Sequence, residues 1–152
     1  MGLATAKGMA LALGKPVVGL SSLEILAWQG LQDGEWGFPI IDARRNEVYT
    51  GLYYRRDGRL DLHAGPVLAP ADSSALPAKN EATRAIVCGD ALAEHLASAD
   101  PSRLEARVLV TSAAACAYLA WPRFRSGETE DIHSLAPLYI RRSDAEEKSS
   151  PG

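Results

Sequence analysis

Charged residues that could do chemistry gather in one stretch of the chain, Phe38 to Tyr53. An acid, two arginines and a second acid lie close together there, at Asp42, Arg44, Arg45 and Glu47. Charges of both signs at neighbouring positions suit contact with a charged ligand or partner. They equally suit a turn that is merely solvated, and the residue types alone leave both interpretations open.

Two other kinds of catalytic site are disfavoured by spacing. Zinc peptidases of the His-Glu-x-x-His type need two histidines one helical turn apart, whereas the histidines here are widely separated, at His63, His95 and His133. We expect His63 to pair with Asp61 on one face of a strand. The segment Gly19-Leu20-Ser21-Ser22-Leu23 fails as a nucleophile elbow because Leu23 stands where glycine is needed. Ser21 is better suited to cap a helix.

Composition limits the classes of protein that remain. The chain has 152 residues and 47% hydrophobic content, enough for one core or two small lobes. A net charge of −3 and a sequence pI of about 5.6 argue against an autonomous nucleic-acid binder, which usually has a basic face. The longest apolar run, Ala113 to Trp121, falls well short of the roughly 20 residues of a membrane span. Cys88 and Cys116 have apolar neighbours and no Cys-x-x-Cys spacing, so we expect buried free thiols in a cytoplasmic protein.

Two strands should position the charged stretch. The run before Asp42 is apolar. The run after Glu47 alternates, with Val48, Thr50, Leu52 and Tyr54 on one face and Tyr49, Gly51 and Tyr53 on the other. Period-two alternation with β-branched and aromatic residues is typical of a strand. The polar break between the runs has hairpin length, and Asn46 tolerates a positive φ. We therefore predict an antiparallel hairpin with the charges at its tip.

The segments before the hairpin predict a helix, a strand and a second helix. Gly2 to Leu13 is rich in alanine and leucine and is followed by a Gly-Lys-Pro stop. This helix is apolar almost all the way round, so it needs a partner on more than one side. Val17 to Leu20 is predicted as a short buried strand. Ser21 and Glu24 form a capping box for a helix to about Gln29.

After the hairpin the sequence predicts shorter elements that alternate. They are a turn at residues 56–59, a strand from Leu60 to Leu68 with Pro66 at a sheet edge, a strand from Ala85 to Cys88, a helix capped by Asp90 through Ala97, a strand from Val108 to Val110, a helix from Ala113 to Trp121 ended by Pro122, and a strand from Leu138 to Ile140. Residues 70–82 are predicted as a loop. Helices alternating with strands indicate an α/β layer fold.

Four blocks of this sequence resemble a known family. They are residues 3–11 (LATAKGMAL), 19–23 (GLSSL), 41–49 (IDARRNEVY) and 136–141 (APLYIR), and their order and spacing cover nearly the whole chain. Together they resemble the TsaB (YeaZ) family, the dimerisation subunit of the bacterial complex that makes threonylcarbamoyladenosine on transfer RNA. The resemblance implies the actin-like, Hsp70-like, sugar-kinase-like (ASKHA) fold, which has two lobes.

The family pattern also implies how the chain divides. Members carry three strands, a helix and a further strand upstream, then a Gly-Pro-Gly-Ser-Phe-Thr-Gly loop, and this chain begins just after the place of that loop. We therefore expect residues 1–35 to be a helix-strand-helix remnant of a truncated first lobe. Residues 36–128 should form the second lobe, a hairpin and mixed sheet with helices. Residues 129–142 should return to the first lobe, and residues 143–152 have the composition of a disordered tail.

The resemblance further implies a nucleotide cleft that has lost key residues. The superfamily binds phosphate at an Asp-x-Gly turn, whose equivalent here is Asp42-Ala43-Arg44, with a bulky cation in place of the glycine. On the adenosine side a double glycine is usual, and this chain offers Gly89 followed by Asp90. The expected degenerate cleft comprises Asp42, Arg44, Arg45, Glu47 and Gly89. We expect no catalytic residue, cofactor or metal of the chain's own.

A binding role then remains. By resemblance the partner is a TsaD-type catalytic subunit, which carries the ATP and the metal, and the contact is made by the helix from Gly2 to Leu13. The expected contact residues are Leu3, Ala4, Lys7, Gly8, Leu11 and Ala12. A TsaE-type ATPase would join through the complex, and tRNA would be contacted only indirectly. We expect no membrane contact, and self-association of the chain stays open. The expected function is that of a non-catalytic accessory subunit; the alternatives are a glycoprotease-like (M22-type) peptidase and a kinase-like ATPase.

Overall fold

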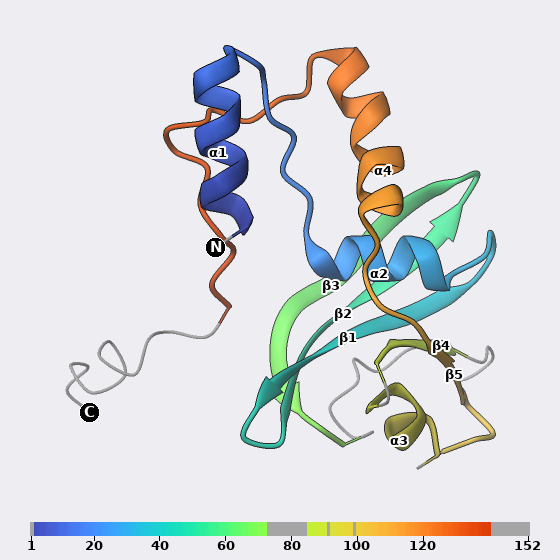
Figure 1. Ribbon diagram of the computed structural model, residues 1–152. Helices are drawn as coiled ribbons and strands as arrows, with labels where there is room; N and C mark the ends of the chain where they lie inside the picture. Colours follow the sequence, from blue (N-terminus) through green and yellow to red (C-terminus); the bar gives the residue numbers. More distant parts are fainter. Residues whose placement is uncertain (1, 73–84, 91, 99, 141–152) are drawn as a thin grey trace.

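A mixed five-stranded sheet forms the centre of the computed structural model, which describes residues 2–72, 85–90, 92–98 and 100–140 (Figure 1). The strands are β1 (Trp36–Arg44), β2 (Glu47–Arg56), β3 (Arg59–Pro70), β4 (Ala85–Gly89) and β5 (Leu104–Val108), in the spatial order β3-β2-β1-β4-β5. The first three pair antiparallel, and β4 pairs parallel with both β1 and β5. The predicted α/β class is confirmed.

The predicted hairpin is present as β1 and β2. Its tip is tighter than the sequence suggests, because Arg44, Arg45 and Asn46 all have left-handed backbones, with φ of 64°, 56° and 60°. Such values cost free energy for any residue with a Cβ, and asparagine adopts them more readily than arginine. The second predicted turn is also present, with Asp57 and Gly58 at positive φ.

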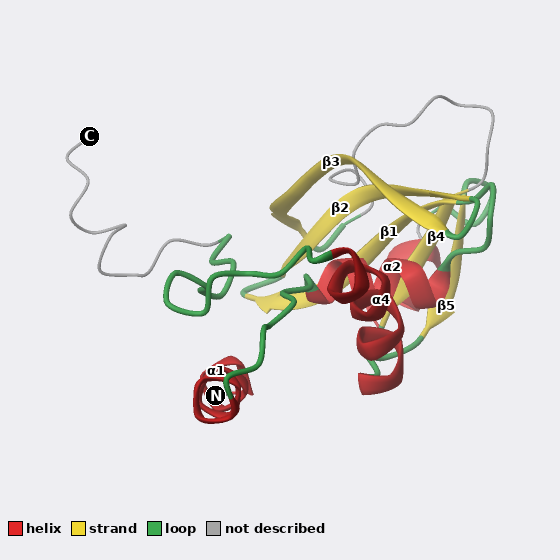
Figure 2. Ribbon diagram, turned by 90° about the horizontal axis from the view of Figure 1, so that it is seen from above, coloured by secondary structure: helices red, strands yellow, loops and turns green. Residues whose placement is uncertain are grey.

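Helices cover both faces of the sheet (Figure 2). On one face α2 (Ser22–Gly30) packs Leu23 and Ala27 against side chains that include Tyr53 and Cys88. On the other face α3 (Leu92–Ser98) packs Leu96 against a cluster that includes Val87. Adjacent residues of β4 therefore point into different cores, and the strand is buried along its whole length.

Two helices lie outside these layers. Helix α1 (Gly2–Leu13) stands apart from the sheet, and Lys7 Nζ donates a 2.7 Å hydrogen bond to the carbonyl of Leu135 (Figures 1 and 2). Helix α4 (Ala113–Ser126) lies against α2. In the described part of the chain, every helix is too short or too polar to cross a membrane.

Two predicted strands are wrong. Residues 17–20 are half-exposed and form only an isolated bridge, between Val17 and Glu130. Residues 138–140 form no strand, and Leu138 and Tyr139 are 67% and 80% exposed. Both segments have strand-forming residues, but in the described chain no strand of the sheet lies beside them to pair with their backbones.

Two element boundaries also differ from prediction. Strand β5 ends at Val108 rather than beginning there, because its register pairs Ala85 with Leu104 and Gly89 with Val108. Helix α4 continues through Pro122 to Ser126 and ends at Gly127, which has φ of 80°. Pro122 lies on the exposed side of the helix, where water can solvate the carbonyl that loses its hydrogen bond.

Three side-chain predictions have mixed outcomes. Ser21 caps α2, since its Oγ accepts the Leu23 N–H at 3.2 Å, but Glu24 pairs with Arg123 instead of completing a capping box. The predicted pairing of His63 with Asp61 is wrong: the His63 ring lies 4.6 Å from that of Trp36, and Asp61 pairs with Arg56. The rings of Trp36 on β1 and Tyr54 on β2 lie on the same side of the sheet as His63 and take up its side chain instead of the carboxylate. Cys88 is buried as predicted, and Cys116 is half-buried. The predictions for residues 73–82 and 143–152 lie outside the described residues.

Thr50 leads to a stability prediction. Its Oγ1 is buried and lacks a hydrogen-bond partner among the described residues. Because a buried hydroxyl without a partner is costly and valine has the same branched shape, Thr50→Val should raise the free energy of unfolding by about 1 kcal/mol. Urea denaturation measures this change. Thr129→Val at an exposed position is the control, expected within about 0.5 kcal/mol of the parent; a loss of stability in Thr50→Val would contradict the assignment.

Candidate functional site at the hairpin tip

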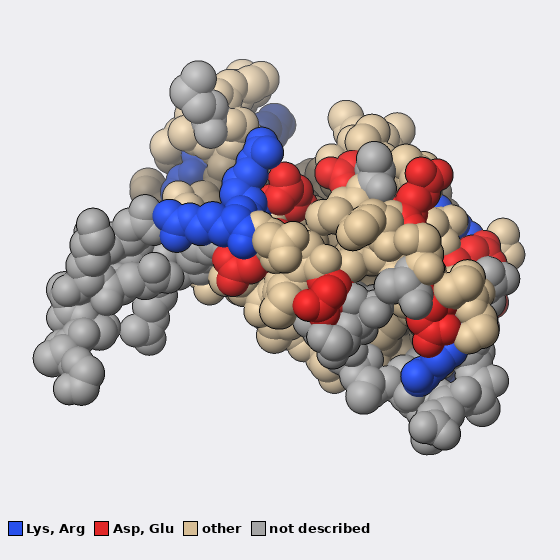
Figure 3. All heavy atoms as spheres, turned by 90° about the horizontal axis from the view of Figure 1, so that it is seen from below, with Lys and Arg blue, Asp and Glu red and all other residues tan. Residues whose placement is uncertain are grey.

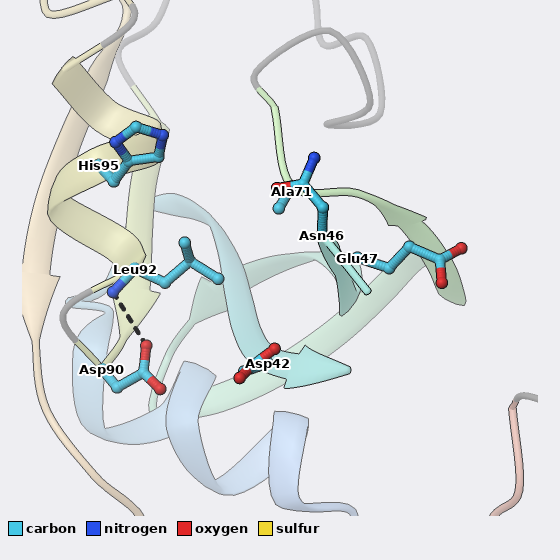
Figure 4. Close-up of a pocket in the computed structure, with 7 residues that line it drawn as sticks. All are labelled: Asp42, Asn46, Glu47, Ala71, Asp90, Leu92 and His95. Carbon is cyan, nitrogen blue, oxygen red and sulfur yellow. Dashed lines mark hydrogen bonds between the residues drawn. The ribbon is translucent and has the colours of Figure 1, made fainter. Parts of the chain in front are cut away.

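A hollow of about 510 Å³ opens beside the hairpin tip (Figure 4). It forms near the carboxyl ends of the parallel strands β1 and β4, where Asp42 lies near the end of β1 and Asp90 follows β4. This edge is where open α/β sheets usually hold ligands. The lining residues are Asp42, Asn46, Glu47, Ala71, Asp90, Leu92 and His95.

Only part of the predicted cleft set converges here. Asp42 and Glu47 line the hollow, whereas Arg44, Arg45 and Gly89 do not. The carboxylate of Glu47 extends away from the hollow (Figure 4). Basic and acidic side chains lie next to one another on the face shown in Figure 3, so the surface carries both signs of charge. The hollow itself is lined by the acids Asp42, Glu47 and Asp90 and by no lysine or arginine among the described residues, so it suits a phosphate group poorly.

Asp42 organises the tip through two contacts with Arg44. Its Oδ1 accepts the Arg44 backbone N–H at 2.7 Å, and its Oδ2 lies 3.3 Å from the guanidinium, whose side chain is 87% exposed. The turn therefore keeps a left-handed backbone at the position where the Asp-x-Gly pattern has glycine, although an arginine occupies it. An ion pair this exposed contributes little to stability, and the backbone hydrogen bond is the stronger constraint.

Gly89 and Asp90 have structural roles in this edge. A Cβ added at Gly89 would lie 2.6 Å from the backbone oxygen of Ile40, so glycine is required for β4 to pack against β1. The Oδ1 of Asp90 accepts the Leu92 N–H at 3.0 Å, as the predicted helix cap should. Strand packing therefore explains the glycine at position 89, and helix capping explains the aspartate at position 90.

The strongly shifted acid–base groups lie in the core rather than in the hollow. Burial raises the pKa of the Cys88 thiol to about 12, and burial raises the pKa of the Tyr53 hydroxyl to about 12. Neither group is ionised near neutral pH. Among the described residues, no group of three or more histidine, cysteine or acidic side chains is arranged to hold a metal ion.

Sequence reasoning missed His95 and Leu92 as neighbours of Asp42. Both follow β4 on α3, and the parallel pairing of β4 with β1 brings them to the same edge. Sequence reasoning also missed a smaller groove of about 260 Å³ on α4. Its lining is apolar and consists of Val18, Ala117, Ala120, Trp121 and Phe124.

Helix α1, which carries the predicted contact residues, exposes most of its surface. Of its residues, all of which are described, only Ala10 is buried. Ala4, Gly8 and Ala12 are exposed, and a Cβ added at Gly8 would have no atom within 4 Å. Leu11 is 54% exposed, whereas Lys7 is half-buried and donates its hydrogen bond to the Leu135 carbonyl.

Comparison with known proteins identifies relatives of this chain. The family model described as "TsaD: tRNA N6-adenosine threonylcarbamoyltransferase" matches residues 1–82. A curated relative, "tRNA threonylcarbamoyladenosine biosynthesis protein TsaB" of Bacillus subtilis (strain 168), is 44% identical over 61 residues, which are 40% of this chain and 27% of the relative.

Two solved structures from Pseudomonas aeruginosa are similar over most of this chain. An uncharacterized protein with similarity to peptidase YEAZ has a TM-score of 0.73 and 28% identity, covering 92% of this chain and 66% of that one. YeaZ itself has a TM-score of 0.70 and 26% identity, covering 90% and 64%. The chain thus spans about two thirds of the length of these structures and about a quarter of the curated relative. These matches and the mixed α/β sheet show that the chain belongs to the TsaB (YeaZ) family and has an ASKHA-like fold.

Proposed function

We propose that the chain takes part in the biosynthesis of threonylcarbamoyladenosine on tRNA as a non-catalytic accessory subunit. It would support a TsaD-type transferase that modifies the adenosine next to the anticodon. The similarity to the Bacillus subtilis TsaB protein supports the biosynthetic role. In this proposal residues 1–35 and 129–142 belong to the first lobe of the fold and residues 36–128 form the second.

The exposed surface of α1 is the observation that carries the accessory role. Met9, Leu11 and Leu13 are 60%, 54% and 66% exposed, although the helix is apolar on several sides. Burying a leucine of this kind contributes about 1.5–3 kcal/mol, so a partner that covers the helix would gain substantially. The exposed small residues Ala4, Gly8 and Ala12 would allow a second helix to approach closely. The proposed contacts are Leu3, Ala4, Lys7, Gly8, Leu11 and Ala12.

The hairpin tip would act as a secondary contact in this assembly. Asp42, Arg44, Arg45 and Glu47 would meet mixed charges on the partner complex or the nucleotide bound there. ATP and metal would reside on the partner, a TsaE-type ATPase would join through the complex, and tRNA would be contacted indirectly. The proposed site of action is the cytoplasm.

The test of the docking helix is co-purification with a TsaD-type subunit. Leu11→Glu should weaken binding at least tenfold, because a charge would enter an apolar contact. The matched control is Leu62→Glu, which changes an exposed leucine on β3, far from α1. Equal recovery of both variants would reject α1 as the contact.

A peptidase is the second candidate function, because one structural relative is described as similar to a peptidase. Incubation of the purified chain with a glycoprotein, with and without zinc, tests it, and a parallel assay with ATP tests a kinase-like activity. The accessory role predicts neither cleavage nor turnover above the buffer control. Activity in either assay that resisted removal of contaminants would overturn the proposal.

A further inference from the structure

Helix α4 buries little of its own surface. Of its residues, all within the described chain, only Ala115 is buried. Tyr118, Trp121 and Phe124 are 65%, 59% and 43% exposed. A helix with so little buried apolar area depends on specific contacts to stay docked, and such helices open more readily than core elements.

The segment that leads into α4 has the features of a joint. Leu109 is anchored, since its N–H donates to the Gly89 carbonyl at 2.6 Å, whereas Val110 is 71% exposed. Gln29 of α2 spans the joint with its side-chain amide. Its Nε2 donates to the Val110 carbonyl at 3.3 Å, and its Oε1 accepts the Ser112 N–H at 3.2 Å. Movement of α4 relative to α2 would pivot between Leu109 and Ser112.

Two further contacts hold α4 beyond the joint. The rings of Trp28 and Tyr118 lie 4.8 Å apart, and Arg55 donates to the Trp28 carbonyl at 2.8 Å and so fixes that residue of α2. Near the far end of α4, the guanidinium of Arg123 donates to the carboxylate of Glu24. The Glu24 and Arg123 side chains are 18% and 38% exposed, so water screens this ion pair only in part.

This ion pair is the contact between α4 and α2 that lies farthest from the joint. The chain beyond α4 is also held, because the Glu130 N–H donates to the Val17 carbonyl at 2.8 Å. Glu24 lies in the first turn of α2 and Arg123 in the last turn of α4, where each charge also interacts favourably with the dipole of its own helix. Each charge therefore also favours its own helix, and we expect loss of the pair to affect the docking of α4 more than the formation of either helix.

We propose that Glu24 and Arg123 form a latch, and that α4 undocks from α2 about residues 109–112 while the sheet stays folded. Opening separates Tyr118 from Trp28 and exposes the face of α4 that now covers α2. The inference rests on contacts within this chain and does not depend on the proposed function.

Native-state hydrogen exchange on the full chain tests the latch. Glu24→Gln should speed exchange of the amides in the second half of α4 roughly tenfold, the size expected for loss of one partly buried charge-assisted contact. Amides of Val48 and Val87, both fully buried in the sheet, should keep their parental rates. The matched control is Asp61→Asn, which removes one carboxylate from the exposed pair with Arg56 and should leave α4 unchanged.

A double-variant comparison separates the latch from general destabilisation. Arg123→Gln should also speed exchange of α4, and the double variant should fall well short of the combined effect of the two single variants, since all three lack the same contact. Unchanged exchange of α4 in Glu24→Gln would overturn the proposal. So would equal acceleration of α4 and sheet amides, or additive effects of the two substitutions.

Discussion

Replacing Gly89 with alanine should lower the free energy of unfolding by about 3 kcal/mol, the upper part of the range for overpacking a core. The new Cβ would lie 2.6 Å from the backbone oxygen and 2.8 Å from the Cγ1 of Ile40. Ile40 is 1% exposed in the middle of β1, so the backbone oxygen cannot retreat without disturbing the pairing of β1 with β2. Urea or thermal unfolding measures the change.

A matched alanine substitution provides the control for Gly89. Gly8→Ala introduces the same Cβ where no atom lies within 4 Å, in the interior of α1. It should leave stability unchanged or raise it by up to about 1 kcal/mol, because alanine favours helix more than glycine does. A Gly89→Ala variant as stable as the parent would show that the glycine is not required for packing.

Glu35→Gln should lower the free energy of unfolding by about 2 kcal/mol at neutral pH, after allowance for partial solvent screening. The guanidinium of Arg107 donates one hydrogen bond to each oxygen of the Glu35 carboxylate, at 2.6 and 2.7 Å. The same carboxylate also accepts the Gln32 N–H at 2.6 Å. Arg107 in turn donates to the Gly30 carbonyl. These bonds tie the loop between α2 and β1 to β5. Glutamine cannot accept both hydrogen bonds from the guanidinium, because one of its two terminal groups is an NH₂ donor.

The pH dependence of this effect has a definite sign. The hydrogen bond from Arg107 holds the pKa of Glu35 below its ordinary value of 4.5. A carboxyl group with a lowered folded-state pKa stabilises the protein fully above its unfolded pKa, and this contribution disappears as the pH falls through the folded-state pKa. The stability difference between parent and Glu35→Gln should therefore be constant above about pH 6 and shrink below the ordinary glutamate pKa. Unfolding curves across that range measure it, with Asp61→Asn as control; a difference that grows on acidification would contradict the assignment.

Much of the fold follows from local sequence patterns. The alternation after Glu47 and the apolar run before Asp42 are enough to place β1 and β2, and Ser21 correctly marks the start of α2. Residues 17–20 show the limit of such reasoning. Their composition is that of a strand, but a strand exists only where a neighbour pairs with its backbone, and local sequence does not specify that neighbour.

The candidate site was harder to predict than the fold, for reasons of chain geometry. Asp42 and His95 share a hollow only because β4 pairs parallel with β1, a contact between segments far apart in the chain. The direction of Arg44 depends on successive left-handed residues, of which only Asn46 gave a sequence signal. Sequence could therefore identify the charged tip but not which charges face the hollow.

The edge strand β3 limits how copies of this protein can associate. Pro66 has no N–H to offer a neighbouring chain, the pairing of β2 with β3 shifts register on either side of Leu52, and the charged residue Arg59 begins the strand. Each feature discourages a foreign strand from adding to the sheet, so strand addition at this edge is disfavoured. The opposite edge of the sheet is β5, a strand of only five residues, which offers a foreign strand a shorter template than β3 would.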